Sequence, residues 1–399
     1  MYMISRLRVA VNRAALKFLN FPKPFTLIGE NSSLALCRMI ARSGVKRALI
    51  ITDAPLFKLG LLEPMLDVFQ QLGTEVRVFS DVEPDPDCEL ILRGVACLQR
   101  FQAEAVLAVG GGSSIDCAKA IVLSHANACH PAKLTGVWLY ALPRKKGLPF
   151  YAIPTTAGTG SEVTVAAVVS DKTAQTKKAI IDPKTAPGMV ALDARLTAGL
   201  PPFLTASTGM DALTHAIEAH MSTMAMPETD ELARTATAMI IRNLPAAFHN
   251  GLDMEARENM LVASSLAGLA FTRAGVGYVH AIAHQLGGLY HIPHGLANAI
   301  ILPYVLKFSK PACSARLSEL AEVANIGTNV MGVSERADAF IEHIRHLNTT
   351  TGIPSAVKEL RPEDMDTVIE RAFAEAHGTY GVPRYMSRSE ARAILRSCS

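Results

Sequence analysis

The sequence has no cysteine pair of the CxxC type, although it contains seven cysteines in 399 residues. An odd number of scattered cysteines argues against a disulfide framework and a cysteine-rich zinc module, and is typical of a reducing compartment. The sequence also lacks an apolar run of the ~20 residues that a membrane-spanning helix needs. We therefore expect a cytoplasmic protein that has no membrane partner.

Neither sign of charge is in large excess, since the formal net charge is +3. This value is too small to indicate nucleic acid binding, and no cluster of basic and aromatic residues suggests it. The composition, 49% hydrophobic and 19% charged, is that of a soluble globular protein. A chain of 399 residues exceeds the usual size of one hydrophobic core, so we expect two domains.

The first 29 residues contain no acidic side chain, whereas Arg6, Arg8, Arg13 and Lys17 are interleaved with apolar residues. Such basic amphipathic stretches occur in transit peptides and in helices that lie on membrane surfaces. The stretch lacks the long apolar core of a secretory signal. We favour a third interpretation, an arm that packs on its own domain or on a second subunit.

Short β-rich runs alternate with helical stretches in the first half of the chain, which indicates βαβ units and a parallel sheet. The expected strands are residues 48–52, 76–79, 105–109, 149–153 and 166–170. Helical patterns follow the Pro201-Pro202 break, at residues 206–221, 228–244, 254–270, 279–289, 312–331 and 336–350. We predict an α/β dinucleotide-binding domain over residues 1–198, with the basic arm 1–29 included, and an all-helical metal-binding domain over residues 199–399.

The phosphate-binding signatures GxGxxG and GxxxxGK[ST] are absent, but Gly110-Gly111-Gly112-Ser113 follows an expected strand and opens an expected helix. Consecutive glycines let the backbone approach a ligand, and the N–H groups at a helix start favour phosphate. A plain tight turn would explain the glycines equally well.

A second polar loop favours the cofactor interpretation. Thr155, Thr156 and Thr159 stand beside two glycines after the next expected strand, and suit the phosphates and ribose of a dinucleotide. Asp53, after an earlier strand, could accept bonds from the adenosine ribose of NAD and repel the 2′-phosphate of NADP. An ordinary helix N-cap is the alternative for Asp53.

The metalloprotease signature HExxH is absent, but the helical half is rich in possible metal ligands. Asp211 and His215 are spaced i, i+4, as are His280 and His284, which places each pair on one helix face. Four of the twelve histidines fall within residues 280–294, where chance would place about half of one. One aspartate and three imidazoles suit Fe²⁺ or Zn²⁺.

Any single histidine is also open to a structural explanation. A hydrogen-bonded residue of the core is the interpretation that we favour for His220 and His291.

Four stretches of the sequence resemble the iron-containing (group III) NAD-dependent alcohol dehydrogenases: residues 108–121, 153–164, 208–220 and 279–303. The resemblance implies the dehydroquinate synthase-like fold of that family, with a parallel-sheet α/β domain followed by an all-α domain. The sequence departs from the family pattern at Val382-Pro383-Arg384, where the family often has Asn-Pro-Arg preceded by a cysteine.

The resemblance also implies the roles of individual residues. It implies a metal held by Asp211, His215, His280 and His294, with His284 near the nicotinamide, where it is our candidate proton relay. The implied NAD contacts are Asp53, Gly111, Gly112, Ser113, Asp116, Thr155, Thr156, Thr159 and Lys177, with Lys178 as the alternative to Lys177. For the substrate pocket we expect Ala166, Leu266 and Phe271.

We therefore expect a metal-dependent alcohol dehydrogenase or aldehyde reductase that transfers hydride between NAD(H) and a small primary alcohol or aldehyde in the interdomain cleft. A polyol dehydrogenase and a hydroxyacid–oxoacid transhydrogenase are the alternatives on this fold. A synthase would need Lys or Arg beside the ligands, where the sequence is nearly uncharged, and a filament or scaffold module is disfavoured because all four ligands are present. We expect a homodimer or a higher homo-oligomer.

Overall fold

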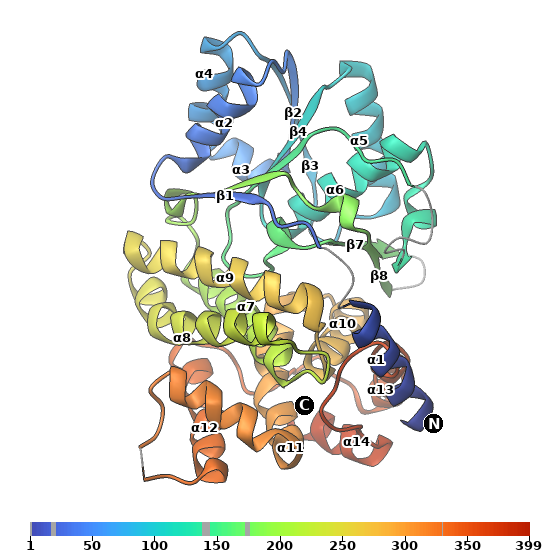
Figure 1. Cartoon of the computed structure of the whole chain (residues 1–399), viewed down its shortest axis with the longest axis vertical. Coiled ribbons are helices and arrows are strands. Elements are labelled where there is room, and N and C mark those ends of the chain that lie inside the picture. The colour runs from blue at the N-terminus through green and yellow to red at the C-terminus, as the bar shows by residue number, and fades with distance from the viewer. Residues whose placement is uncertain (1, 17–20, 138–143, 172–175, 329) are drawn as a thin grey trace. The chain divides into compact units, whose positions relative to one another are not determined.

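The computed structural model of the chain describes residues 2–16, 21–137, 144–171, 176–328 and 330–399. The chain forms two compact units, Phe21–Gly199 and the combination of Met1–Asn20 with Leu200–Ser399. The first is an α/β unit and the second is helical, as predicted (Figure 1).

The α/β unit is built on a six-stranded sheet in which every strand pair is parallel. In spatial order the strands are β1 (Phe25–Ile28), β9 (Met189–Leu192), β6 (Phe150–Pro154), β4 (Ala105–Gly110), β2 (Arg47–Asp53) and β3 (Glu75–Val82). Figure 1 shows helices on both faces of this sheet. They are α2 (Ser32–Arg42), α3 (Ala54–Lys58), α4 (Glu63–Gln71), α5 (Cys88–Phe101) and α6 (Gly112–Asn127).

The strand order places the chain reversal between β2 and β4. From β2 the chain moves outward to β3 and then returns to the other side of β2 to form β4. Loops that follow two such strands leave in opposite directions and open a crevice, which is where α/β sheets bind ligands. Asp53 ends β2 and the triple glycine begins at the end of β4, so both predicted cofactor segments lie at this point.

A second, three-stranded sheet lies in the same unit. Its order is β5-β8-β7, with β7 and β8 antiparallel. The expected strand at residues 166–170 belongs to this sheet. The three strands are β5 (Gly136–Val137), β7 (Ala166–Asp171) and β8 (Thr176–Ile181).

The helical unit is organised around α7 (Pro202–Met221), which is buried over most of its length. The other helices are α8 (Pro227–His249), α9 (Met254–Ala274), α10 (Tyr278–Tyr290), α11 (His294–Val323), α12 (Val333–Thr350), α13 (Met365–Ala376) and α14 (Arg388–Ser397). Among the described residues no single helix is long and apolar enough to span a membrane; α9 and α10, bent by 103°, reach that length and apolarity only when taken together.

The helix expected at residues 312–331 differs from the structure at both ends. α11 starts at His294 and bends at Cys313, two residues after Pro311, so the expected start coincides with the bend. It ends at Val323, because Asn325 and Gly327 take left-handed backbone angles that end a helix (φ 56° and 87°).

The basic N-terminal arm is grouped with the helical unit, whereas we expected it in the α/β domain. It forms helix α1 (Tyr2–Leu16). Tyr2 Oη donates to Met386 O at 3.1 Å, and Arg13 donates to Ala225 O at 3.2 Å. Both acceptors are backbone groups of the helical unit. Neither contact could be predicted from sequence, because the partners lie 384 and 212 residues apart.

Candidate functional site

Four side chains with metal-ligand chemistry meet in the helical unit, although they come from three helices. Asp211 and His215 lie one turn apart on α7. His280 lies in the first turn of α10, and His294 is the first residue of α11. One ligand atom from each residue lies within 4.8 Å of the others. The structure therefore brings together all four predicted metal ligands.

Close packing of α11 against α7 brings His294 to Asp211. A Cβ atom at Gly295 would lie 2.3 Å from the backbone oxygen of Ser207 on α7, so this contact requires glycine. His294 Nε2 thereby approaches Asp211 Oδ1 to 3.5 Å. Asn298, one turn further along α11, donates from Nδ2 to the same Asp211 oxygen at 2.6 Å and orients the carboxylate.

One ring nitrogen of His280 is bonded, and the other is directed at the site. Nδ1 lies 2.6 Å from Glu218 Oε2, and this carboxylate also accepts the backbone N–H groups of Gly277 and Val279 at 2.7 Å each. Because the carboxylate accepts from Nδ1–H, Nε2 presents its lone pair. Nε2 is buried, has no hydrogen-bond partner among the described residues and lies 3.9 Å from Asp211 Oδ1.

The charge states around His280 suit metal binding. Burial raises the pKa of Glu218 to about 7, against the opposing effect of the backbone N–H groups of Gly277, Val279 and His280. Burial and the neighbouring His215 and His294 rings hold the pKa of His280 well below its usual value, so the ring is neutral. Neutral imidazole is the form that ligates metals, and one carboxylate with three imidazoles suits Fe²⁺ or Zn²⁺. The residues present therefore fit such an ion.

His284, one turn after His280 on α10, has its own carboxylate partner. His284 Nδ1 lies 2.6 Å from Glu375 Oε1 on α13, and Tyr380 Oη donates to the same oxygen at 2.6 Å. Burial alone would raise the pKa of Glu375, but the charge of His284 and these two hydrogen bonds outweigh it and lower that pKa. The His284 ring stacks on His294 with centroids 5.2 Å apart. His284 is thus oriented beside the candidate metal ligands.

Of the two apolar residues expected on α9, one lies at the metal site. The Phe271 ring stacks on His215 with centroids 4.2 Å apart. Leu266 instead packs against Ala216 on α7, Ala236 on α8 and Ala267. Phe271 therefore covers one side of the metal ligands, and Leu266 contributes to helix packing.

The two loops predicted to bind phosphate lie side by side in the α/β unit, because they follow the directly paired strands β4 and β6. Gly111 is the N-cap of α6, which places Gly112 and Ser113 in the first helical turn with N–H groups available to an anion. Thr155 N donates to Gly110 O at 3.1 Å and joins the loops.

The two loops touch closely at Gly112, where a larger residue does not fit, and are in ordinary contact at Gly111. A Cβ atom at Gly112 would lie 2.6 Å from Thr159 Cγ2, and one at Gly111 would lie 3.4 Å from Thr156 Oγ1. Gly111 and Gly112 therefore lie against Thr156 and Thr159, while Thr155 is buried.

Two side chains that lie one turn apart on α6, Asp116 and Lys119, hold the threonine loop and the residues after it by hydrogen bonds. Lys119 is fully buried, and burial lowers its pKa to about 8. Its Nζ donates at 2.6, 2.9 and 2.7 Å to the backbone oxygens of Ser161, Thr164 and Ala166. Asp116 accepts from Ser161 Oγ at 2.5 Å and from Val168 N at 2.8 Å. Asp116, a predicted cofactor contact, thus uses both carboxylate oxygens within the protein.

Three further predicted residues take defined positions. Asp53 caps α3, since its Oδ1 accepts Leu56 N at 2.9 Å, as the alternative interpretation stated. Lys177 is 12% exposed and pairs with Asp85 at 2.6 Å, whereas Lys178 is 53% exposed. Ala166 begins β7.

Our sequence reasoning missed the residues behind the ligands and misplaced one histidine. Glu218 shares a face of α7 with Asp211 and His215, and Asn298 lies one turn after His294 on α11, so helical spacing could have revealed both; Glu375 has no comparable signal. His291, expected in the core, is exposed and ends α10 with a left-handed backbone (φ 56°).

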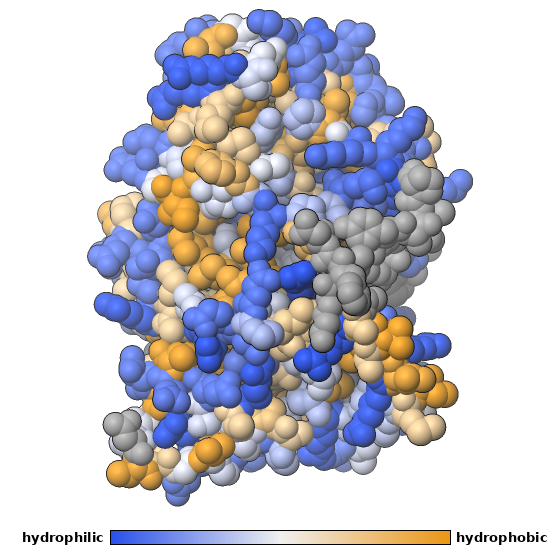
Figure 2. Space-filling view, viewed as in Figure 1, coloured by the Kyte–Doolittle hydropathy of each residue, from blue (hydrophilic) through white to orange (hydrophobic). Residues whose placement is uncertain are grey.

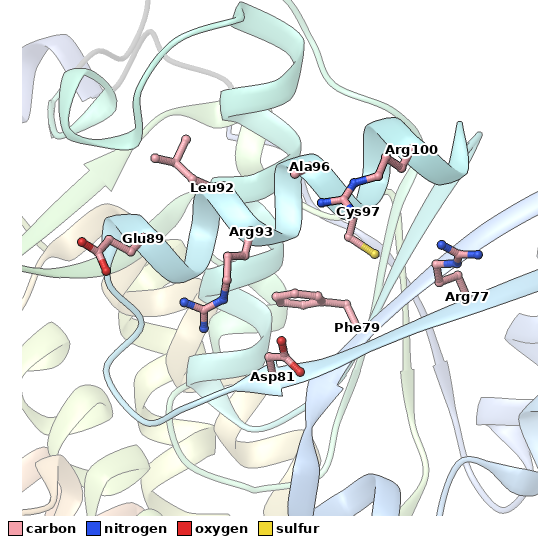
Figure 3. A pocket seen from close by; sticks show the side chains of 9 residues that line it. All are labelled: Arg77, Phe79, Asp81, Glu89, Leu92, Arg93, Ala96, Cys97 and Arg100. Atoms are coloured by element: carbon pink, nitrogen blue, oxygen red, sulfur yellow. The ribbon is translucent and has the colours of Figure 1, made fainter.

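A surface pocket in the α/β unit lies apart from these segments, between β3 and α5 (Figure 3). It combines three arginines and two carboxylates with apolar side chains, so its charge is mixed. Its lining residues are Arg77, Phe79, Asp81, Glu89, Leu92, Arg93, Ala96, Cys97 and Arg100.

Comparisons with known proteins match both halves of the chain. Residues 24–194 match the model of the iron-containing alcohol dehydrogenases, and residues 205–399 match the C-terminal model of the same family. The chain is 37% identical to alcohol dehydrogenase 4 of Schizosaccharomyces pombe, over 94% of this chain and 87% of that protein. It is also 37% identical to the NAD-dependent methanol dehydrogenase of Bacillus methanolicus, over 94% and 98%.

A solved structure agrees with these relatives. The crystal structure of a 1,3-propanediol oxidoreductase superposes with a TM-score of 0.90 at 35% identity, over 96% of this chain and all of that one. The chain therefore belongs to the iron-containing alcohol dehydrogenase family and is a metal-dependent alcohol dehydrogenase.

Proposed function

We propose that this enzyme interconverts a small primary alcohol and its aldehyde with NAD(H), using a metal held by Asp211, His215, His280 and His294. The observation that supports this most directly is the convergence of four ligand atoms within 4.8 Å. We further propose that Phe21–Gly199 binds the dinucleotide and that Leu200–Ser399 binds the metal.

The metal site contains residues with two kinds of role. The four ligands hold the ion, and Glu218 and Asn298 position His280 and Asp211. A bound Fe²⁺ or Zn²⁺ supplies Lewis-acid polarisation of the alcohol or carbonyl oxygen. The stacked Phe271 ring covers one side of His215 and keeps water from that side of the ligands.

The cofactor proposal rests on the paired loops at the ends of β4 and β6. Gly111, Gly112 and Ser113 offer backbone N–H groups to the phosphates, while Thr155, Thr156 and Thr159 offer hydroxyls. Asp116 acts indirectly in our proposal, by holding Ser161. Lys177 is our choice for the nicotinamide ribose, because it lies near Asp116 and therefore near the threonine loop that Asp116 holds. Burial raises the pKa of Asp116, and the positive charge of Lys177 acts in the opposite direction.

NAD rather than NADP is proposed on the position of Asp53. Its carboxylate stands at the end of β2, at the strand reversal, where it would accept ribose hydroxyls and repel a 2′-phosphate. The methanol dehydrogenase relative is described as NAD-dependent.

Proton transfer is assigned to His284. Glu375 accepts the Nδ1 proton of His284, so Nε2 is the nitrogen that exchanges a proton with substrate or solvent. Tyr380 and Gln285 donate to the two oxygens of Glu375 at 2.6 and 3.0 Å, so the carboxylate cannot rotate away.

For the substrate we propose a small, largely apolar alcohol, because Phe271 and Ala166 offer no charge. We also propose that the enzyme works in the cytoplasm as a homo-oligomer without a nucleic acid partner. Exposed apolar side chains on an edge strand favour assembly: Phe25 and Ile28 of β1, the first strand of the sheet order among the described residues, are 60% and 53% exposed.

The proposal is tested by purifying the protein without oxygen, loading it with Fe²⁺, and following NADH oxidation with aldehydes from acetaldehyde to octanal. We expect turnover with NADH and little with NADPH. Asp53→Asn should raise the NADPH rate, while Asp67→Asn on α4 is the matched control. Absence of turnover across the panel, with metal and NADH both bound, would contradict the small-alcohol assignment and favour a polyol or a hydroxy acid.

A further inference from the structure

Helix α1 is amphipathic in an unusual sense, because its outward side is apolar. Ser5 and Val9 face the protein and are buried. Met3, Leu7 and Val11 follow one another at intervals of four residues and are 82%, 65% and 60% exposed. This spacing places them in one row on the opposite side of the helix. Figure 2 shows hydrophobic side chains gathered over α1, at the lower right.

All charged side chains of α1 are positive. Arg6, Arg8 and Arg13 are exposed, and α1 contains no acidic residue. The Arg6 guanidinium lies 5.8 Å from the centroid of the Tyr385 ring, and Arg13 bonds Ala225 O. These contacts hold the arginines at the border between the docked side of the helix and the exposed row.

The helix is firmly docked, so its outward row is a fixed surface. The Tyr2 ring stacks on Tyr385 with centroids 5.0 Å apart, and its hydroxyl donates to Met386 O. The aromatic contact continues to His377, whose Nε2 lies 2.8 Å from Tyr278 Oη at the start of α10.

We propose that α1 is a membrane-contact helix: the row Met3, Leu7 and Val11, with Ile4 beside it (60% exposed), inserts into the headgroup region of an anionic lipid surface, and the flanking arginines bind lipid phosphates. An apolar helix face bordered by basic side chains is the pattern of helices that lie in this interface. Anionic headgroups supply the negative charge that α1 and its neighbours in sequence lack. The proposal replaces our expectation that the protein has no membrane partner.

Two other occupants fit this face less well. Pairing α1 with α1 of a second copy would bring two sets of arginines together without an acidic residue on either helix, which is unfavourable. An apolar groove on another protein would cover the same row, but it would also need acidic groups at its rim to match the arginines, whereas an anionic lipid surface offers apolar and negative groups together. A lipid surface requires only shallow burial of the exposed side.

The test is co-sedimentation of the full-length protein with vesicles, first pure phosphatidylcholine and then phosphatidylcholine mixed with phosphatidylglycerol. We expect binding to the mixed vesicles only, and weaker binding at high salt, because added ions screen the arginines. The double variant Leu7→Ser, Val11→Ser should bind about tenfold more weakly, since two large apolar side chains no longer insert. Leu252→Ser, which alters a residue that is 74% exposed in another part of the helical unit, should bind normally.

Light scattering and dehydrogenase activity complete the experiment. The double variant should keep the oligomeric state and the activity of the native protein, since neither residue belongs to the catalytic site. If the native protein sediments with neither kind of vesicle, the proposal is wrong. It is also wrong if the double variant changes the oligomeric state, because α1 would then be a contact between copies.

Discussion

Glu218 accepts three N–H groups behind His280, and an amide in its place could not accept all three. We expect Glu218→Gln to weaken metal binding roughly 10–100-fold, because the His280 ring loses the partner that fixes its proton on Nδ1. Metal content after dialysis against a chelator series measures this. The matched control is Glu319→Gln on α11. It alters the carboxylate that pairs with His220, a histidine that lies on α7 like Glu218 but is not a candidate ligand. Full metal retention by Glu218→Gln would refute the ligand role of His280.

Glu375 has the corresponding role behind His284, but on the path of the proton. Glu375→Gln should lower kcat roughly 10–100-fold while metal content stays unchanged, because the His284 ring is no longer oriented. Steady-state kinetics with metal analysis test this, with Glu370→Gln on the outer side of α13 as the control. Equal kcat values for Glu375→Gln and the control would remove Glu375 from the mechanism.

The same substitution has a pH signature in stability. The pKa of Glu375 is lower in the folded protein than in the unfolded chain, so ionisation stabilises the fold above the unfolded pKa, and this contribution is lost as the pH falls through the folded pKa. The stability difference between native protein and Glu375→Gln should therefore shrink below about pH 4.3. Denaturant unfolding at neutral and acidic pH measures it.

The four side chains that converge at the candidate metal site could be singled out from sequence, because i, i+4 spacing and family motifs are local signals. Glu218 and Asn298 lie one turn from candidate ligands on α7 and α11, but the bonds that these and Glu375 form could not be predicted, because they cross long stretches of chain: 91 residues separate His284 from Glu375, and 87 separate Asp211 from Asn298. Such pairings exist only after α7, α10, α11 and α13 have packed.

Among the elements, the contact of α11 with α7 decides the geometry of the metal site. In Gly295→Ala, the new methyl group would meet the Ser207 carbonyl at 2.3 Å, and α11 would have to move with His294. We expect a loss of about 1–3 kcal/mol in stability of the metal-free protein, together with weaker metal binding. Thermal unfolding and metal titration measure the two effects. Gly199→Ala, where a Cβ atom meets nothing within 4 Å, should change neither.

The periodicity of the sequence predicted which segments are helices and which are strands, but it did not predict which of them pack together. The alternation of strands and helices predicted the parallel sheet, and the loops after β4 and β6 were identified from their glycines and threonines. The association of α1 with the helical unit depends on Tyr2 meeting Met386, 384 residues later, for which periodicity has no signal. The bend in α11 was visible only through Pro311, and was mistaken for a helix start.

At the scale of the whole molecule, the reactivity of the cysteine thiols can distinguish the folded from the unfolded protein. All seven lie in the described part of the chain and are free. Burial raises the pKa of Cys37, Cys313 and Cys398 to about 12, and raises that of Cys117 further. These four buried thiols should react with a thiol reagent only after unfolding.

The three partly exposed cysteines, Cys88, Cys97 and Cys129, should react in the native state, and Cys97 is accessible from the pocket in Figure 3. Thiol titration in the absence and presence of denaturant counts both classes. A reducing agent should not change the melting temperature, because no disulfide is broken; a decrease would disprove the free-thiol state.

The origin of the four proposed ligands in three separate helices has a consequence for how the enzyme is supplied with its ion. No short segment of the unfolded chain contains the complete set, so a tight site exists only once α7, α10 and α11 have assembled. Metal binding is therefore coupled to the folding of the helical unit, and the ion should stabilise the packing of these three helices against one another.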